Sequence, residues 1–169
     1  MEISEDRLRT VQKSLSGPDQ RLEPPLVVLL AVASLVADSE IQHATATKIE
    51  GRPLDEAPFT TWRYVALIPA GLVVLDATKP VADWEMGDIE RPDQAAPKID
   101  ARFIPLSEVA YCKVVGIESL SAREWLATWE IGVRNQEPVH LPTGRSRSQR
   151  VAASAVGRAI LDRLAAEVQ

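Results

Sequence analysis

The feature that most constrains the fold is a change of hydrophobic period in the last quarter of the chain. From Glu124 to Val133 apolar and polar residues alternate, which is typical of a strand with one buried face. After Gly144 the period becomes 3.6, and the apolar residues form the stripe of an amphipathic helix: Ala153, Val156, Ile160, Leu164 and Val168. Ser146 and Gln149 have the spacing of a capping box that starts this helix. We therefore expect the chain to end in a sheet covered by one helix.

The amino-acid composition limits the class of protein to which the chain can belong and the kinds of partner that it can bind. With 169 residues, 46% of them hydrophobic, the chain can bury one sizeable core, and we expect a single folding unit. A net charge of −5 argues against a nucleic-acid partner, because such binding depends on cationic contacts to phosphate. The single cysteine, Cys112, excludes an intramolecular disulfide and a cysteine-rich zinc site, and it fits a reducing compartment. We expect a cytoplasmic protein without a cofactor or a metal.

Residues 1–40 are predicted to form a helical extension packed on the rest of the chain. Ser4 is a suitable N-cap, and Leu8, Val11 and Leu15 follow with helical spacing. Leu26–Ala37 is apolar, but it spans 12 residues where a bilayer needs about 20, and the acids and prolines before it are untypical of an export signal. We expect this segment in the core. Its alanines favour a helix and its valines favour a buried strand, and we prefer the helix.

Residues 41–169 have the pattern of an antiparallel sheet. Pro69-Ala70-Gly71 separates two apolar runs and predicts a hairpin turn. Three prolines between residues 77 and 100 predict a long loop or a frayed edge hairpin in that region, and not a central strand. The predicted strands are Ile41–Ile49, Thr60–Ile68, Leu72–Asp76, Ala101–Ile104, Leu106–Gly116, Glu124–Arg134 and Pro138–Leu141.

Two stretches carry a resemblance to a known family. Arg102–Val109 (RFIPLSEV) enters a strand with a basic-apolar-Pro-Leu pattern, and Tyr64–Asp76 (YVALIPAGLVVLD) forms a strand pair before it. With about seven strands and a C-terminal helix, residues 41–168 resemble the bacterial pleckstrin-homology-like (PH-like) domains. The resemblance implies an α+β fold, a small bent antiparallel β-barrel capped by the C-terminal helix, in proteins that bind lipids, peptides or other proteins.

The usual lipid site of that family is not expected here. Lipid-binding members carry several lysines and arginines in and around the first hairpin loop. In this chain that loop is Lys48–Glu56, with two basic residues against three acids. Such a loop would repel a phosphoinositide headgroup.

The one concentrated basic feature is Arg145, Arg147 and Arg150, at the start of the C-terminal helix. A helix N-terminus attracts anions, and arginines there can hold a phosphate or carboxylate in bidentate fashion. His140 lies shortly before them in the sequence. An anion-binding site formed by these four residues is therefore one hypothesis. The alternative, which we prefer, is that Ser146 caps the helix and the arginines are solvated.

An acidic loop begins at residue 83, and contact with a partner is one hypothesis for it. Aromatic and methionine side chains among charges are common at interfaces. The contact residues on this hypothesis are Asp83, Trp84, Glu85, Met86 and Asp88. The alternative, which we prefer, is a solvated loop whose Trp84 folds back onto the barrel. The carboxylates lack the spacing of an EF-hand, so we expect no metal.

We expect no catalytic residues. The chain has no nucleophile elbow, P-loop or dinucleotide-binding motif. A nucleophilic Cys112 would need His43 or His140 beside it, and its apolar neighbours favour a core position. Trp125 and Trp129 share the apolar face of their strand and are expected to fill the barrel.

The function expected from these observations is a non-enzymatic module that binds a protein or peptide partner. One alternative is peripheral binding of an anionic lipid or a phospho-ligand through the turn from Arg145 to Arg150. A second is a small-molecule pocket or an enzyme inside the barrel. A homodimer that forms through the N-terminal helix is a further alternative.

Overall fold

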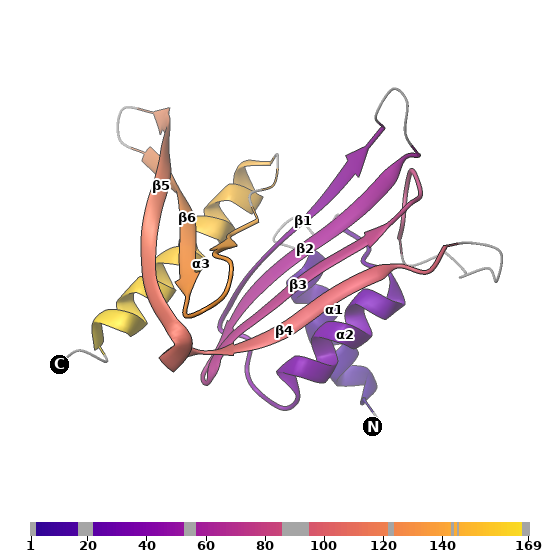
Figure 1. Ribbon diagram of the computed structural model, residues 1–169, viewed down its shortest axis with the longest axis horizontal. Coiled ribbons are helices and arrows are strands. Elements are labelled where there is room, and N and C mark those ends of the chain that lie inside the picture. The colour runs from indigo at the N-terminus through magenta and orange to yellow at the C-terminus, as the bar shows by residue number, and fades with distance from the viewer. Residues whose placement is uncertain are drawn as a thin grey trace.

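The computed structural model describes residues 3–16, 22–52, 57–85, 95–121, 124–142, 144 and 146–166. Within these ranges the fold is α+β: seven antiparallel strands form two sheets, and the last helix is C-terminal (Figure 1). The elements are α1 Glu5–Ser16, α2 Leu26–Val36, β1 His43–Gly51, β2 Phe59–Ile68, β3 Gly71–Lys79, β4 Lys98–Pro105, the 3₁₀ turn η1 Leu106–Glu108, β5 Val109–Ser121, β6 Glu124–Val133, β7 Val139–His140 and α3 Arg147–Ala166.

The two N-terminal helices form where the sequence predicts them. Ser4 Oγ accepts a hydrogen bond from the Arg7 backbone N–H at 3.3 Å, which confirms the N-cap of α1. The segment after Pro25 is the helix α2, so the strand alternative is wrong. The helical period puts Val28, Val32 and Val36 on one face, and all three are fully buried. None of the three described helices combines the length and the apolar character needed to cross a membrane.

The first sheet has the strand order β1-β2-β3-β4 and is covered on both faces. On one face Trp62, Tyr64 and Ala66 pack in a core with α1 and α2. On the other face Val65 and Leu67 pack in a core with the second sheet and α3. Burial on both faces explains why β2 and β3 are apolar almost throughout.

The hairpin predicted at Pro69-Ala70-Gly71 is confirmed, because Ile68 pairs with Gly71 across a tight turn. A Cβ on Gly71 would lie 2.2 Å from the Ile104 carbonyl oxygen of β4, so only glycine lets the two strands approach this closely.

The second sheet has the order β5-β6-β7, and α3 packs across β1 and β6. The predicted capping box is confirmed: the Gln149 N–H donates to Ser146 Oγ, and the Ser146 N–H donates to Gln149 Oε1, both at 3.2 Å. Further along α3, Val156 and Ile160 are fully buried in the second core, as the apolar stripe predicts. Val168 lies outside the described residues.

The closed β-barrel expected from the sequence is not found among the described strands. Their hydrogen bonds form two separate ladders, β1 to β4 and β5 to β7. The η1 turn separates β4 from β5, and α3 lies against both β1 and β6. Figure 1 shows the two sheets diverging from the corner between β4 and β5.

Candidate functional site

The β5–β6 hairpin carries the most exposed large apolar side chains of the described residues. Ile117 is 68% exposed and Trp125 is 61% exposed. The expectation that Trp125 fills the core is therefore wrong, whereas Trp129 is buried as predicted. Trp129 packs against Gly157 of α3, and Trp125 lies four residues closer to the end of the hairpin, roughly 13 Å along an extended strand. The hairpin extends beyond the core that α3 covers.

Strand register brings these side chains together. Ile117 pairs with Ala127 and Ser119 pairs with Trp125, so Ile117 and Trp125 are diagonal neighbours on one face of the hairpin. Val115, at an irregularity of the same strand, is also exposed. We call Val115, Ile117 and Trp125 the hairpin surface. Among the described strands, none pairs with the outer edge of β5.

Two residues of the predicted anion site, Arg150 and His140, lie against two different carboxylates. Arg150 pairs with Glu118 of β5, with Nη1 2.7 Å from Oε2, and so ties α3 to the hairpin. Arg147 is exposed on the first turn of α3, and Arg145 lies outside the described residues. His140 lies on β7, where its Nδ1 is 3.8 Å from Glu130.

Glu130 is the centre of a polar row across the outer face of the second sheet. Register aligns Lys113, Glu130 and His140 on neighbouring strands. The Lys113 Nζ lies 2.6 Å from the carboxylate and the Tyr111 hydroxyl donates to it at 2.9 Å. These two hydrogen bonds, with that from Lys113 first, hold the pKa of Glu130 below its usual value. This row depends on strand register, so spacing along the sequence does not predict it.

The start of the predicted acidic contact loop folds against the first sheet. Trp84 is 1% exposed and lies in the first core, and its carbonyl oxygen accepts a hydrogen bond from Trp62 Nε1 at 2.9 Å. The alternative, with Trp84 folded back, is the arrangement that the structure has. Trp84 therefore offers no surface to a partner in this structure. Met86 and Asp88 lie outside the described residues.

Asp83 and Glu85 bind a lysine of β1. The Lys48 ammonium contacts Asp83, Glu85 at 2.6 Å and Glu50 at 2.9 Å, and it lies 6.0 Å from the centre of the Trp62 ring. Burial alone would lower the pKa of Lys48, but the hydrogen bonds to the three carboxylates raise it more. This cluster fastens residues 83–85 to the sheet, and its three carboxylates against one ammonium leave a net negative charge there.

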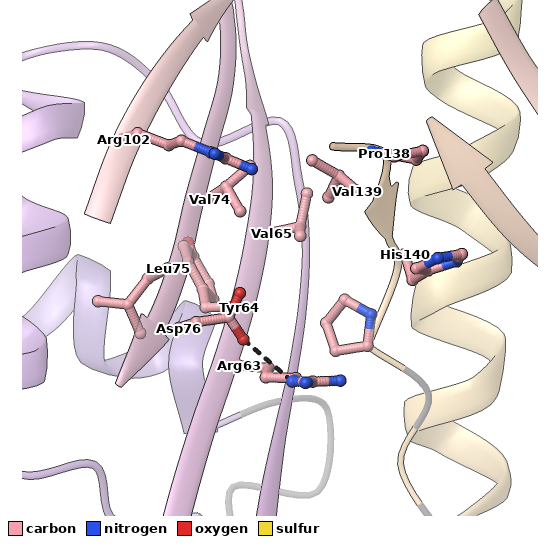
Figure 2. A pocket seen from close by; sticks show the side chains of 11 residues that line it. Arg63, Tyr64, Val65, Val74, Leu75, Asp76, Arg102, Pro138, Val139 and His140 are labelled. Atoms are coloured by element: carbon pink, nitrogen blue, oxygen red, sulfur yellow. Dashed lines mark ion pairs between the residues drawn. The ribbon is translucent and has the colours of Figure 1, made fainter. Parts of the chain in front are cut away.

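A pocket of about 160 Å³ lies between the first sheet and the segment around β7 (Figure 2). We call it the interlayer pocket. Val65 and Val74 of the first sheet line it, with Val139 of β7 opposite. Two arginines of the first sheet also line it. Arg63 pairs with Asp76 at 3.0 Å, whereas the buried Nε of Arg102 has no hydrogen-bond partner.

In the described part of the chain, the remaining reactive side chains do not form a catalytic site. Cys112 Sγ donates to the Gly157 carbonyl oxygen at 3.6 Å, and burial raises the pKa of this thiol to about 11. Such a thiol is a poor nucleophile at neutral pH. Across residues 3–166, gaps excepted, no three histidine, cysteine or acidic side chains gather as metal ligands would.

Comparison with family models, with curated proteins and with solved structures finds no match to this chain.

Proposed function

We propose that this protein is a non-enzymatic binding module that recognises a protein or peptide partner through the hairpin surface. The observation that carries the proposal is the exposure of Ile117 and Trp125 on one face of a projecting hairpin. Tryptophan is among the residues that most often dominate binding energy at protein interfaces. Covering the exposed part of Trp125 would remove on the order of 100–150 Å² from water, worth about 3 kcal/mol at about 25 cal/mol/Å².

The free edge of β5 adds backbone groups that a partner can use. An edge strand presents unpaired N–H and C=O groups to an extended peptide. β5 has irregular pairing with β6 at three points, and Tyr111–Val114 is the regular run between the first two. A partner strand would therefore pair along this short run and place its apolar side chains toward the hairpin surface.

The other candidate functions have weaker support. Lipid or phospho-ligand binding through Arg145, Arg147 and Arg150 would have to displace Arg150 from Glu118. A metabolite enzyme needs a pocket of about 300 Å³ or more. The interlayer pocket, at about 160 Å³, is smaller, and three larger hollows of about 450, 520 and 510 Å³ have no histidine or cysteine among their lining residues. We retain a PH-like barrel and a cytoplasmic location as proposals that rest on the sequence alone.

The test uses peptides selected from a random display library against the full chain. Affinities are then measured by calorimetry for the wild type and for Ile117→Asp and Trp125→Ala. We expect both variants to weaken binding about tenfold or more, because each removes buried apolar area. Leu26→Asp is the matched control, since Leu26 is an exposed apolar residue on α2.

Two results would contradict this function. One is equal weakening by Leu26→Asp, and the other is wild-type affinity in both hairpin variants. Circular dichroism of each variant establishes that it is folded. Sedimentation of the free protein shows whether the partner is a second copy, in which case the hairpin variants would be monomeric.

A further inference from the structure

One arginine of the interlayer pocket differs from the other half-buried arginines. Arg7 donates from Nη2 to the Ser39 carbonyl oxygen at 2.7 Å, and Arg150 pairs with Glu118. Arg163 donates to the carbonyl oxygen of Pro69 at 3.0 Å and to Gln42 Oε1 at 2.7 Å. The buried Nε atoms of Arg7, Arg102 and Arg150 all have no acceptor, but Arg7 and Arg150 bond through their terminal nitrogens. Among the described residues, no carboxylate lies within ion-pairing distance of Arg102.

The surroundings of Arg102 make the lack of an acceptor energetically unfavourable when no ligand is bound. Arg102 pairs in register with Val74, which pairs with Val65, so the residues directly across from it are apolar. Asp76 and Asp100 follow two positions further along the same face, and neither forms an ion pair with Arg102. Figure 2 shows the Arg102 guanidinium beside Val74 at one end of the pocket, with Val139 across from it. A guanidinium that is partly removed from water without an acceptor loses free energy that an anion would restore.

The other residues that line the pocket indicate the kind of chemical group that carries the anion. Val65, Val74, Val139 and Pro138 give the pocket an apolar part, and Asp76 and His140 add polar groups to its lining. A volume of about 160 Å³ open to the centres of water molecules is roughly ten times what one water needs, which is about 10–15 Å³, so a small organic group fits. At the far end Arg63 is already neutralised by Asp76, so the pocket has room for one negative charge and a few carbon atoms.

We propose that the interlayer pocket binds a carboxylate carried on a small branched apolar group, with the carboxylate on Arg102 and the apolar group on the valines. The source of this chemistry is a free short-chain carboxylic acid or the C-terminal residue of a peptide. The pocket is formed by the first sheet and β7, so this site is separate from the hairpin surface.

The test is a titration of the full chain at constant ionic strength, followed by NMR of the backbone amides. The probes are isovalerate, its neutral amide isovaleramide, and the peptide acetyl-Ala-Val with a free or an amidated C-terminus. We expect saturable shifts around Val74 and Val139 with the charged probes, and binding at least about tenfold weaker with the neutral ones, because a hydrogen bond to a charged group is lost. Tighter binding of the peptide acid than of isovalerate identifies a C-terminus as the source, and equal binding identifies a free acid.

Variants of Arg102 complete the test. Arg102→Gln should lose about tenfold or more in affinity for isovalerate, and Arg102→Lys should retain part of it, because lysine keeps the charge and loses the planar fork. Arg134→Gln, an exposed arginine near the end of β6, is the matched control and should bind as the wild type does.

A purely structural arginine would behave differently. Removing a desolvated and unpaired charge should leave the melting temperature of Arg102→Gln unchanged or raise it. The proposal is overturned if the wild type shows no saturable shifts with the charged probes. It is also overturned if Arg102→Gln binds isovalerate as tightly as Arg134→Gln does.

Discussion

The contact between Gly157 and Trp129 predicts that replacing this helical glycine with alanine destabilises the protein, which is the reverse of the usual effect. In the middle of a helix, alanine is usually more stable than glycine by about 1 kcal/mol. Here a Cβ on Gly157 would lie 2.3–2.4 Å from three ring atoms of Trp129, which is itself buried at 5% exposure. The ring would have to move by about 1 Å to restore an ordinary contact, and overpacking of this kind costs about 1–3 kcal/mol. Gly157→Ala is therefore expected to lower the free energy of unfolding by about 1 kcal/mol net.

Urea unfolding followed by circular dichroism measures this change, and a loss of about 1 kcal/mol corresponds to about 2–4 °C in melting temperature for a chain of this size. Ala155→Gly, at an exposed position of the same helix, is the control for helix propensity alone. In a Trp129→Leu background the smaller side chain can move aside, so Gly157→Ala should there become stabilising. An increase of about 1 kcal/mol for Gly157→Ala in the wild-type background would refute the reasoning, because propensity would then outweigh the contact.

Two further predictions concern buried titratable groups. Because the pKa of Cys112 is raised to about 11 from 9.0, a thiol reagent at pH 8 should react about 100-fold more slowly with the folded protein than in urea, and equal rates would contradict this burial. Lys48→Met should lower the free energy of unfolding by about 1 kcal/mol, a value reduced for the solvent exposure of Glu50, Asp83 and Glu85. Since the pKa of Lys48 is raised on folding, its contribution is complete below pH about 10.4 and is lost as the pH rises further, so the difference between variant and wild type should shrink in alkaline urea titrations.

Local signals in the sequence predicted most of the secondary structure. The capping box at Ser146, the turn after Pro69 and the helix from Leu26 each depend on residues a few positions apart, and each is confirmed. Strand ends were predicted less well: β3 continues to Lys79 and β4 begins at Lys98, in a region where prolines predicted a loop. Barrel closure was predicted and not found, because it depends on pairing between strands that are distant in the sequence.

The candidate sites could be predicted only in part. Periodicity placed Trp125 and Trp129 on one face correctly, but it carries no information on how far along that face α3 reaches. Arg102 was noted only as part of the family-like pattern that enters a strand. That this guanidinium lacks an acceptor depends on side chains from β3 and β7, which are separated from it by tens of residues.

The position of the first sheet between two cores determines which parts of the molecule can open independently. β2 and β3 contribute alternate side chains to both cores, so these two strands cannot separate from the sheet without opening both cores. Amide hydrogens in β2 and β3 should consequently exchange only through global opening, while those of the projecting hairpin exchange through local fluctuations. We therefore expect a rigid first sheet and a more flexible β5–β6 hairpin. The hairpin can then adjust to a bound ligand while the two cores stay unchanged.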